Sequence, residues 1–145
     1  MDIKINTNAK DVAKRIGKKG KELSASVKRA LSITAQVGIN IIEDRTREGV
    51  GFKGGKFKPY STKGRNGGYA GFRQRKNRGL TPDLSFTGEM LGSMTSRASR
   101  SQAEIFFRGA TESKKAAMNN KTRPFFGFSS REEKQLGEVF FRALK

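Results

Sequence analysis

The chain offers few side chains that could break or form bonds. Its 145 residues include no cysteine and no histidine, which excludes a disulfide, a Cys/His zinc site, a cysteine nucleophile and a histidine base. Two adjacent carboxylate pairs remain, Glu43 with Asp44 and Glu132 with Glu133. Neighbouring residues point about 100° apart on a helix, so neither pair converges on one metal ion. We therefore expect no enzyme, and no catalytic, cofactor-binding or metal-binding residues.

The chemistry that the composition does favour is the binding of anions. Lysine and arginine number 31 against 13 acidic residues, which gives a formal net charge of +18 at pH 7. The positive charge is densest in the segment Val50–Pro82, which we call the basic arm. From Val50 to Thr81 the arm carries eight glycines, nine basic residues, five interleaved aromatics and no acid. Such a balance points to polyanions or acidic protein surfaces as partners.

The basic arm supplies the candidate binding residues. Its many glycines leave the backbone too permissive for a regular element, and so long a loop is normally functional or disordered. We therefore expect an extended arm that is largely disordered in the free protein and becomes ordered against a partner. The candidate partner-binding or polyanion-binding residues are Lys53, Lys56, Phe57, Lys58, Tyr60, Arg65, Arg73, Arg75, Lys76 and Arg78.

The elements that must position the arm begin with a strand and a long helix. Ile3 and Ile5 alternate with polar residues, which predicts a short strand or an ordered N-terminal segment. An apolar face at helical spacing then predicts a short helix before Gly17 and a main helix from about Lys21 to Glu48. The residues of that face are Val12, Ile16, Leu23, Val27, Leu31, Thr34, Val37 or Gly38, and Ile41. The main helix is either an amphipathic core helix or an inter-subunit coiled contact.

Beyond the arm, the sequence predicts a short helix and a hairpin. Residues 84–94, LSFTGEMLGSM, cluster apolar side chains around Thr87, which is a suitable N-cap. From Thr95 to Arg108 the pattern changes to period two, which predicts two strands joined by a turn at Arg100 and Ser101. The residues predicted to share one face of the second strand are Ala103, Ile105 and Phe107.

Two further helices should complete the chain. Residues 111–120 predict a short helix that Asn119 and Asn120 would end. Ser129 and Glu132 stand at capping-box spacing and predict the start of a C-terminal helix. We expect that helix to pack on the long helix and on the hairpin face of Ile105 and Phe107 through Leu136, Phe140 and Leu144.

The segment RPFFGFSS, residues 123–130, predicts an irregular turn at Pro124 and Gly127. It is either a plug that binds a partner or, as we favour, a turn that seals the core before the last helix. We expect Phe125 or Phe128 to be buried.

Together these patterns predict a single α+β domain, in which a long N-terminal helix and a C-terminal helix pack on a small antiparallel sheet beside a long basic Gly-rich loop. We divide it into an N-terminal arm and short helix (1–20), a long helix (21–48), the basic extended loop (50–82) and a compact α+β part (84–145). An apolar fraction of 34% leaves a modest core. No stretch approaches the roughly 18 to 20 apolar residues of a membrane span, so we expect a soluble, cytoplasmically made protein.

Three segments also resemble a known family in their order and spacing. They are GFKGGKFKPYS (51–61), LSFTGEMLGSM (84–94) and RPFFGFSS (123–130). Together they resemble the virion morphogenesis proteins of tailed bacteriophages, a family of minor neck, head-tail joining and tail-completion proteins. The matching positions are Gly55, Phe57, Pro59, Tyr60 and Ser61, then Thr87, Gly88, Leu91 and Ser93, then Arg123, Pro124, Phe125, Gly127 and Ser129.

The resemblance implies a structural role at the joint between capsid and tail, with no catalytic residues. It implies a homo-oligomeric ring, of six copies or alternatively twelve, beside connector and tail proteins, with packaged DNA in the lumen as a further candidate partner. The location would be the virion neck or tail after assembly in the bacterial host cytoplasm. The alternative function is a basic nucleic-acid-binding module, for RNA or DNA, that uses the Gly/Arg/aromatic arm.

Three destinations for the charge of the arm stay open, namely solvent around a flexible loop, an acidic neighbouring subunit, and DNA. A compact domain of this length is about 40 Å across, and a duplex of that length offers about 24 phosphates. Six arms around a duplex would carry about 54 cations, so some of them must meet protein. Because a duplex offers no free bases for stacking, we expect Phe57 and Tyr60 to insert into neighbouring subunits.

Overall fold

The spine of the protein is a 30-residue helix, α2 (Lys18–Arg47), which follows the short helix α1 (Ala9–Arg15). The computed structural model describes residues 1–15 and 17–144. Gly17 separates the two helices with a φ of 61°, a left-handed conformation that glycine adopts without strain. Gly20 does not interrupt α2, so the long helix begins at Lys18 rather than at the predicted Lys21.

The apolar face of α2 forms the centre of the core. The buried residues of α2 include Gly20, Ser24, Val27, Ala30, Leu31, Thr34, Ala35, Gly38, Ile39, Ile42 and Thr46. A Cβ at Gly38 would lie 2.9 Å from Phe128 Cζ and 3.1 Å from Ile105 Cδ1, so this glycine lets two elements approach the helix closely. Ile16 and the side chain of Val12, which belong to the predicted face, lie outside the described residues. Over the part of the chain that the structure describes, no helix combines the length and apolar character needed to cross a bilayer.

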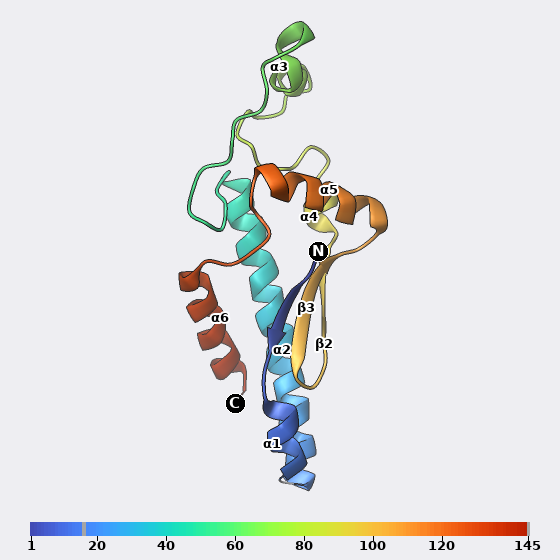
Figure 1. Ribbon diagram of the computed structural model, residues 1–145, viewed down its shortest axis with the longest axis vertical. Coiled ribbons are helices and arrows are strands. Elements are labelled where there is room, and N and C mark those ends of the chain that lie inside the picture. The colour runs from blue at the N-terminus through green and yellow to red at the C-terminus, as the bar shows by residue number, and fades with distance from the viewer. Residues whose placement is uncertain (16, 145) are drawn as a thin grey trace.

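A three-stranded antiparallel sheet packs against α2, with the strand order β1-β3-β2 (Figure 1). The strands are β1 (Ile3–Asn6), β2 (Met94–Ala98) and β3 (Gln102–Phe107). Ile3 lies opposite Ile105, and Met94 lies opposite Phe107. The predicted face of Ala103, Ile105 and Phe107 is buried, which confirms the hairpin and the α+β fold.

Two short helices follow the predicted pattern with different ends. In front of α4 (Glu89–Gly92) the N-cap is Gly88, with a φ of 84°, and not the predicted Thr87. The Thr87 hydroxyl instead accepts a hydrogen bond from the Glu89 backbone N–H at 3.4 Å. Helix α5 (Ala110–Thr122) continues past the predicted end at Asn120. The side-chain oxygen of Asn120 accepts the backbone N–H groups of residues 125 and 126, at 3.0 Å each, and so holds the turn that follows the helix.

The last helix, α6 (Ser130–Ala143), begins with the predicted capping box. The Ser129 hydroxyl accepts the Glu132 backbone N–H, and the Glu132 carboxylate accepts the Ser129 backbone N–H. Helix α6 runs alongside α2 (Figure 1). Leu136 is buried, and Phe140 and Leu144 are partly buried against the core that contains Ile105 and Phe107.

Phe140 and Phe141 form a matched pair for testing how α6 packs. Phe140→Ala should cost about 1.5–3 kcal/mol of unfolding free energy, less than the loss of a fully buried phenylalanine, because its ring is only partly covered. Phe141 is 69% exposed, so Phe141→Ala should change stability by less than about 0.5 kcal/mol. Urea unfolding followed by circular dichroism measures both. Equal losses in the two variants would contradict the packing of α6.

The molecule is elongated, with α1 near one end and the basic arm at the other (Figure 1). At 1.5 Å per residue, α2 alone rises about 45 Å. The compact shape of about 40 Å expected from chain length is therefore wrong. A DNA duplex that runs parallel to the long axis of this molecule would present more phosphates than the roughly 24 expected for a compact domain. The number of charges alone therefore does not decide between DNA and protein as the partner of the arm.

Candidate partner-binding arm

The basic arm leaves α2 after Gly49 and projects beyond the body of the protein (Figure 1). It contains the 3-10 turn η1 (Arg65–Gly67) and the helix α3 (Gly68–Arg75), so the prediction of an arm without regular elements is wrong. A Cβ at Gly71 would clash with the Asn66 carbonyl oxygen, and one at Gly68 would clash with that of Lys63. The glycines that argue against a helix thus allow α3 to fold tightly on the turn before it.

Arg73 is the central side chain of the arm and not a free cation. It is only 1% exposed. Its Nε donates to the Gly79 carbonyl at 2.8 Å, its Nη1 to the Ser85 carbonyl at 3.1 Å, and its Nη2 to Asp83 Oδ1 at 3.2 Å. Its guanidinium also lies 4.7 Å from the centre of the Tyr60 ring. Arg73 therefore folds the arm from inside, and its predicted role as a partner-binding residue is wrong.

A row of aromatic rings runs along the arm beside Arg73. The ring centres of Tyr60 and Tyr69 are 5.1 Å apart, those of Tyr69 and Phe72 are 6.1 Å apart, and those of Phe72 and Phe86 are 5.4 Å apart. Burial raises the pKa of the Tyr60 hydroxyl, with the Arg73 guanidinium opposing, so this hydroxyl stays neutral at physiological pH. Tyr69 and Phe72 remain 42% and 37% exposed, and they form the accessible aromatic part of the arm.

The base of the arm is anchored to the body by Phe57 and Arg123. The Phe57 N–H donates to the Gly49 carbonyl at 2.7 Å, and its side chain is buried in the core of its own chain. Arg123 donates to the carbonyls of Lys58 and Pro59, at 2.9 and 3.2 Å, and its guanidinium lies 5.1 Å from the centre of the Tyr60 ring. The expectation that Phe57 inserts into a neighbouring subunit is therefore wrong. Tyr60 likewise lies against two guanidinium groups of its own chain.

All three segments that carry the family resemblance meet at this base. They line an open pocket of about 490 Å³, with Tyr60, Ser61, Thr87, Gly88 and Arg123 among its residues. Other motif residues are structural, because Leu91 and Phe125 are buried and the Pro124 carbonyl accepts the Phe52 N–H at 3.1 Å. A Cβ at Gly127 would lie 2.9 Å from the Phe52 ring. The turn of residues 123–130 thus seals the core and also fixes the arm.

The remaining basic residues of the arm point to solvent. The exposed cations are Lys53, Lys56, Lys58, Lys63, Arg65, Arg75, Lys76 and Arg78. Lys53, Lys56 and Lys58 belong to the loop at the base, whereas Arg65 to Arg78 surround η1 and α3. Three of these cations also contact other groups of the chain. Arg75 donates to the Asn66 carbonyl at 2.9 Å, Arg78 lies 5.7 Å from the Phe86 ring centre, and Lys53 lies 5.9 Å from the Phe52 ring centre. The eight exposed cations therefore form an extended basic surface on a folded arm, and they do not converge on a single binding site.

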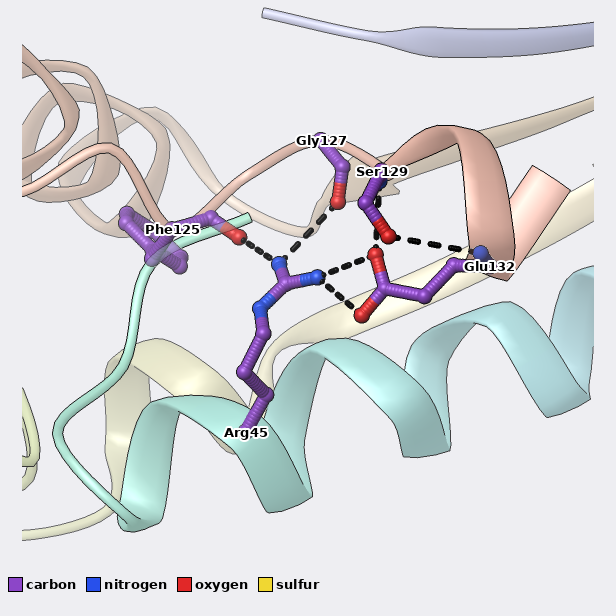
Figure 2. A network of polar contacts seen from close by, with 5 residues as sticks. All are labelled: Arg45, Phe125, Gly127, Ser129 and Glu132. Carbon is purple, nitrogen blue, oxygen red and sulfur yellow. Dashed lines mark hydrogen bonds and ion pairs between the residues drawn. The ribbon is translucent and has the colours of Figure 1, made fainter. Parts of the chain in front are cut away.

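Sequence reasoning missed Arg45, which ties the turn of residues 123–130 to α2 (Figure 2). Its Nη1 donates to both Glu132 carboxylate oxygens at 2.6 Å. Its Nη2 donates to the carbonyls of Phe125 and Gly127, at 2.6 and 3.0 Å. Arg45 and Glu132 are 87 positions apart, and nothing in a single sequence singles out this pair among its many cations and carboxylates.

The Glu132 carboxyl makes stability depend on pH. Burial alone raises its pKa, but hydrogen bonds from the Ser129 backbone and Arg45 outweigh burial, so the pKa lies below its ordinary value of 4.5. Ionised Glu132 therefore contributes stability above about pH 4.5 that is lost as pH falls through the folded-state pKa. Urea unfolding should show Glu132→Gln less stable than the wild type at pH 7, with the gap closing toward pH 3. A gap that stays constant with pH would contradict this assignment.

The arrangement is suited to docking a large partner, because it combines a projecting folded element, exposed cations and two accessible aromatic rings. Glu132 is paired with Arg45, and Glu43 with Arg47, so both predicted carboxylate pairs have a member held by an arginine.

Comparisons of the chain with protein-family models, with curated proteins and with solved structures find no match.

Proposed function

We propose that this protein is a structural subunit of the neck or tail of a tailed bacteriophage, where it joins the head connector to the tail or completes the tail as one copy in a ring. The observation that carries the proposal is the basic arm, which has eight exposed cations. Its ninth cation, Arg73, is buried and makes the hydrogen bonds that hold the arm together, so the other eight are available to a partner. No acid lies between Val50 and Thr81 to neutralise them, so their counter-charge comes from outside the arm. The three motif segments that fix the arm supply the family resemblance.

A neighbouring protein surface is the partner that the arm fits best. Aromatic side chains and arginines are the residues that most often dominate binding energy at protein interfaces. Exposed Tyr69 and Phe72 lie on α3 together with Arg75, and Arg78 follows three residues after that helix. A closed ring needs one surface of each copy to contact a different surface of the next. An arm that projects from the body provides such a contact, either to the next copy or to an adjoining connector or tail protein. The family resemblance favours six copies, with twelve as the alternative.

Assembly is the property to test first. Light scattering and negative-stain microscopy of the purified full-length protein should show rings of six or twelve copies, alone or with the proteins of the joint. Mass spectrometry of purified tailed particles should find the chain at the same copy number. A protein that stays monomeric with every candidate neighbour and is absent from mature particles would refute the proposal.

A nucleic-acid-binding module is the second candidate, and the exposure of Tyr69 and Phe72 is the observation that favours it. Bases of a single strand can stack on such rings, at about 1–3 kcal/mol per base. Tyr69→Ala with Phe72→Ala would then weaken binding to a single-stranded oligonucleotide at least tenfold. Under the favoured proposal, the same double substitution weakens assembly and leaves single-strand binding unchanged.

A further inference from the structure

A second basic surface lies near the end of the molecule opposite the arm, where α1 meets the first turns of α2 (Figure 1). It is an open cleft of about 270 Å³. Its lining residues are Lys10 and Lys14 from α1, Gly17 between the helices, Gly20, Lys21 and Ser24 from α2, and Arg100 from the turn between β2 and β3. Two consecutive helices and a distant hairpin turn thus bring four cations to one concavity.

The lining of the cleft supplies no counter-charge to the four cations. Lys10, Lys14, Lys21 and Arg100 are all exposed, and none of the residues that line the cleft is acidic. Among the residues that the structure describes, ion pairs involve other side chains. Like charges gathered around one small cleft repel each other, and a bound anion relieves that repulsion.

The lining of the cleft distinguishes a phosphate backbone from a protein partner. Interfaces between proteins are centred on aromatic or large aliphatic anchors, and the cleft contributes none, since it consists of lysine, arginine, glycine and serine. Those residue types, together with backbone N–H groups, are the ones that contact DNA phosphates. Gly17 is exposed, and a Cβ there would meet nothing within 4 Å, so this position leaves room for a backbone to approach. The arm has the opposite character, because aromatic rings are interleaved with its cations.

We propose that the cleft of Lys10, Lys14, Lys21 and Arg100 binds the phosphodiester backbone of duplex DNA without reading its sequence. Contacts to phosphate carry no sequence information directly, and the cleft offers no aromatic, carboxylate or amide side chain, so duplexes of unrelated sequence should bind equally. This inference does not depend on the proposed role of the arm. In a joint through which DNA passes, it assigns the DNA contact to the α1 end and the protein contact to the arm.

The test is the salt dependence of DNA binding by the full-length protein. Fluorescence anisotropy of a labelled duplex of about 20 base pairs is measured at several salt concentrations, and each phosphate contact contributes about 0.9 to the slope of log K against log salt. A variant with Lys10→Gln, Lys14→Gln, Lys21→Gln and Arg100→Gln should lose about 3 to 4 units of slope and at least about 100-fold in affinity near 0.1 M salt. The wild-type slope should be the same for duplexes of unrelated sequence.

A matched control removes the same charge elsewhere. Lys114→Gln, Lys121→Gln, Arg131→Gln and Lys134→Gln take three lysines and one arginine from exposed positions on α5 and α6, and this variant should keep nearly the full slope. Equal losses in the two variants would show that binding is spread over the whole basic surface and would overturn the site. Stronger displacement of the duplex by a polyglutamate peptide than by unlabelled duplex would overturn the assignment to phosphate. If the quadruple cleft variant fails to fold, Lys14→Gln and Arg100→Gln alone should each lower the slope by about one, and unchanged slopes would overturn the proposal.

Discussion

If the protein joins heads to tails as proposed, replacement of Arg75, Lys76 and Arg78 by glutamate should give folded protein that no longer does so. The three side chains are exposed on the arm. The contacts of Arg75 with the Asn66 carbonyl and of Arg78 with the Phe86 ring lie at the surface, so losing each should cost about 1 kcal/mol or less. Placing like charges against an acidic partner costs several kcal/mol, and every 1.4 kcal/mol is about tenfold in affinity. We expect the yield of joined particles in a complementation experiment to fall at least about 100-fold, with free heads and free tails visible by electron microscopy.

Arg73 is left out of this triple variant because its buried guanidinium holds the arm together. Amide hydrogen exchange over residues 64–79 should therefore match the wild type in the triple variant. The control is Lys114→Glu, Lys121→Glu and Lys134→Glu, which reverses three exposed charges away from the arm and should leave the yield of particles unchanged. A normal yield from the arm variant would show that these cations are not part of the joint.

The second large effect is expected at Arg45. Its side chain is 11% exposed and that of Glu132 is 16% exposed, so the pair is largely shielded from water. Arg45→Met leaves the Glu132 carboxylate and the Phe125 and Gly127 carbonyls without the guanidinium. Losing one partner of such a pair should cost about 2–4 kcal/mol of unfolding free energy in urea titrations at pH 7, below the range for a fully buried pair because water still reaches both groups.

Arg47 provides the control, because it lies on the same helix and pairs with Glu43 while 64% exposed. Arg47→Met should cost less than about 0.5 kcal/mol. The double variant Arg45→Met with Glu132→Gln should lose less unfolding free energy than the sum of the losses of the two single variants. Each single variant leaves one charge unpaired, whereas the double variant leaves none. A strictly additive loss, or equal losses at Arg45 and Arg47, would contradict the network in Figure 2.

The parts of the fold that could be predicted are those that a local sequence pattern specifies. The spacing along α2, the period-two pattern of Ala103, Ile105 and Phe107, and the capping box of Ser129 with Glu132 each involve residues a few positions apart. Each pattern specifies one element and the face that it buries. The residue at which a helix begins is harder to predict, as the N-cap at Gly88 shows. A left-handed glycine and a nearby hydroxyl can satisfy the same backbone groups in different ways.

The arm was predicted in its position and charge but not in its structure. Its glycines favour disorder on composition, yet Gly68 and Gly71 serve close backbone packing around α3. Arg73 looks like its basic neighbours in sequence, and only its contacts with Gly79, Asp83 and Ser85 reveal it as an internal residue. Such roles depend on how the chain folds back on itself, and the periodicity of nearby residues does not predict those contacts.

The candidate sites differ in the same way. Eight of the arm's nine basic residues are exposed, as the charge pattern suggests, whereas Phe57 and Arg123 anchor the arm through contacts between distant segments. The cleft of Lys10, Lys14, Lys21 and Arg100 gathers cations from two helices and a hairpin turn. A single sequence cannot place residues about 80 positions apart beside one another, so that cleft could only be found in the folded chain.

Cryo-electron microscopy of intact tailed particles tests the proposed function most directly, because it can locate this chain and the partner of each of its surfaces. We expect a ring of six or twelve copies at the joint between head and tail, with α3 and the exposed cations Arg65, Arg75, Lys76 and Arg78 against acidic protein surfaces. A particle that lacks the chain, or a ring in which the arms reach only solvent or the enclosed DNA, would contradict this expectation.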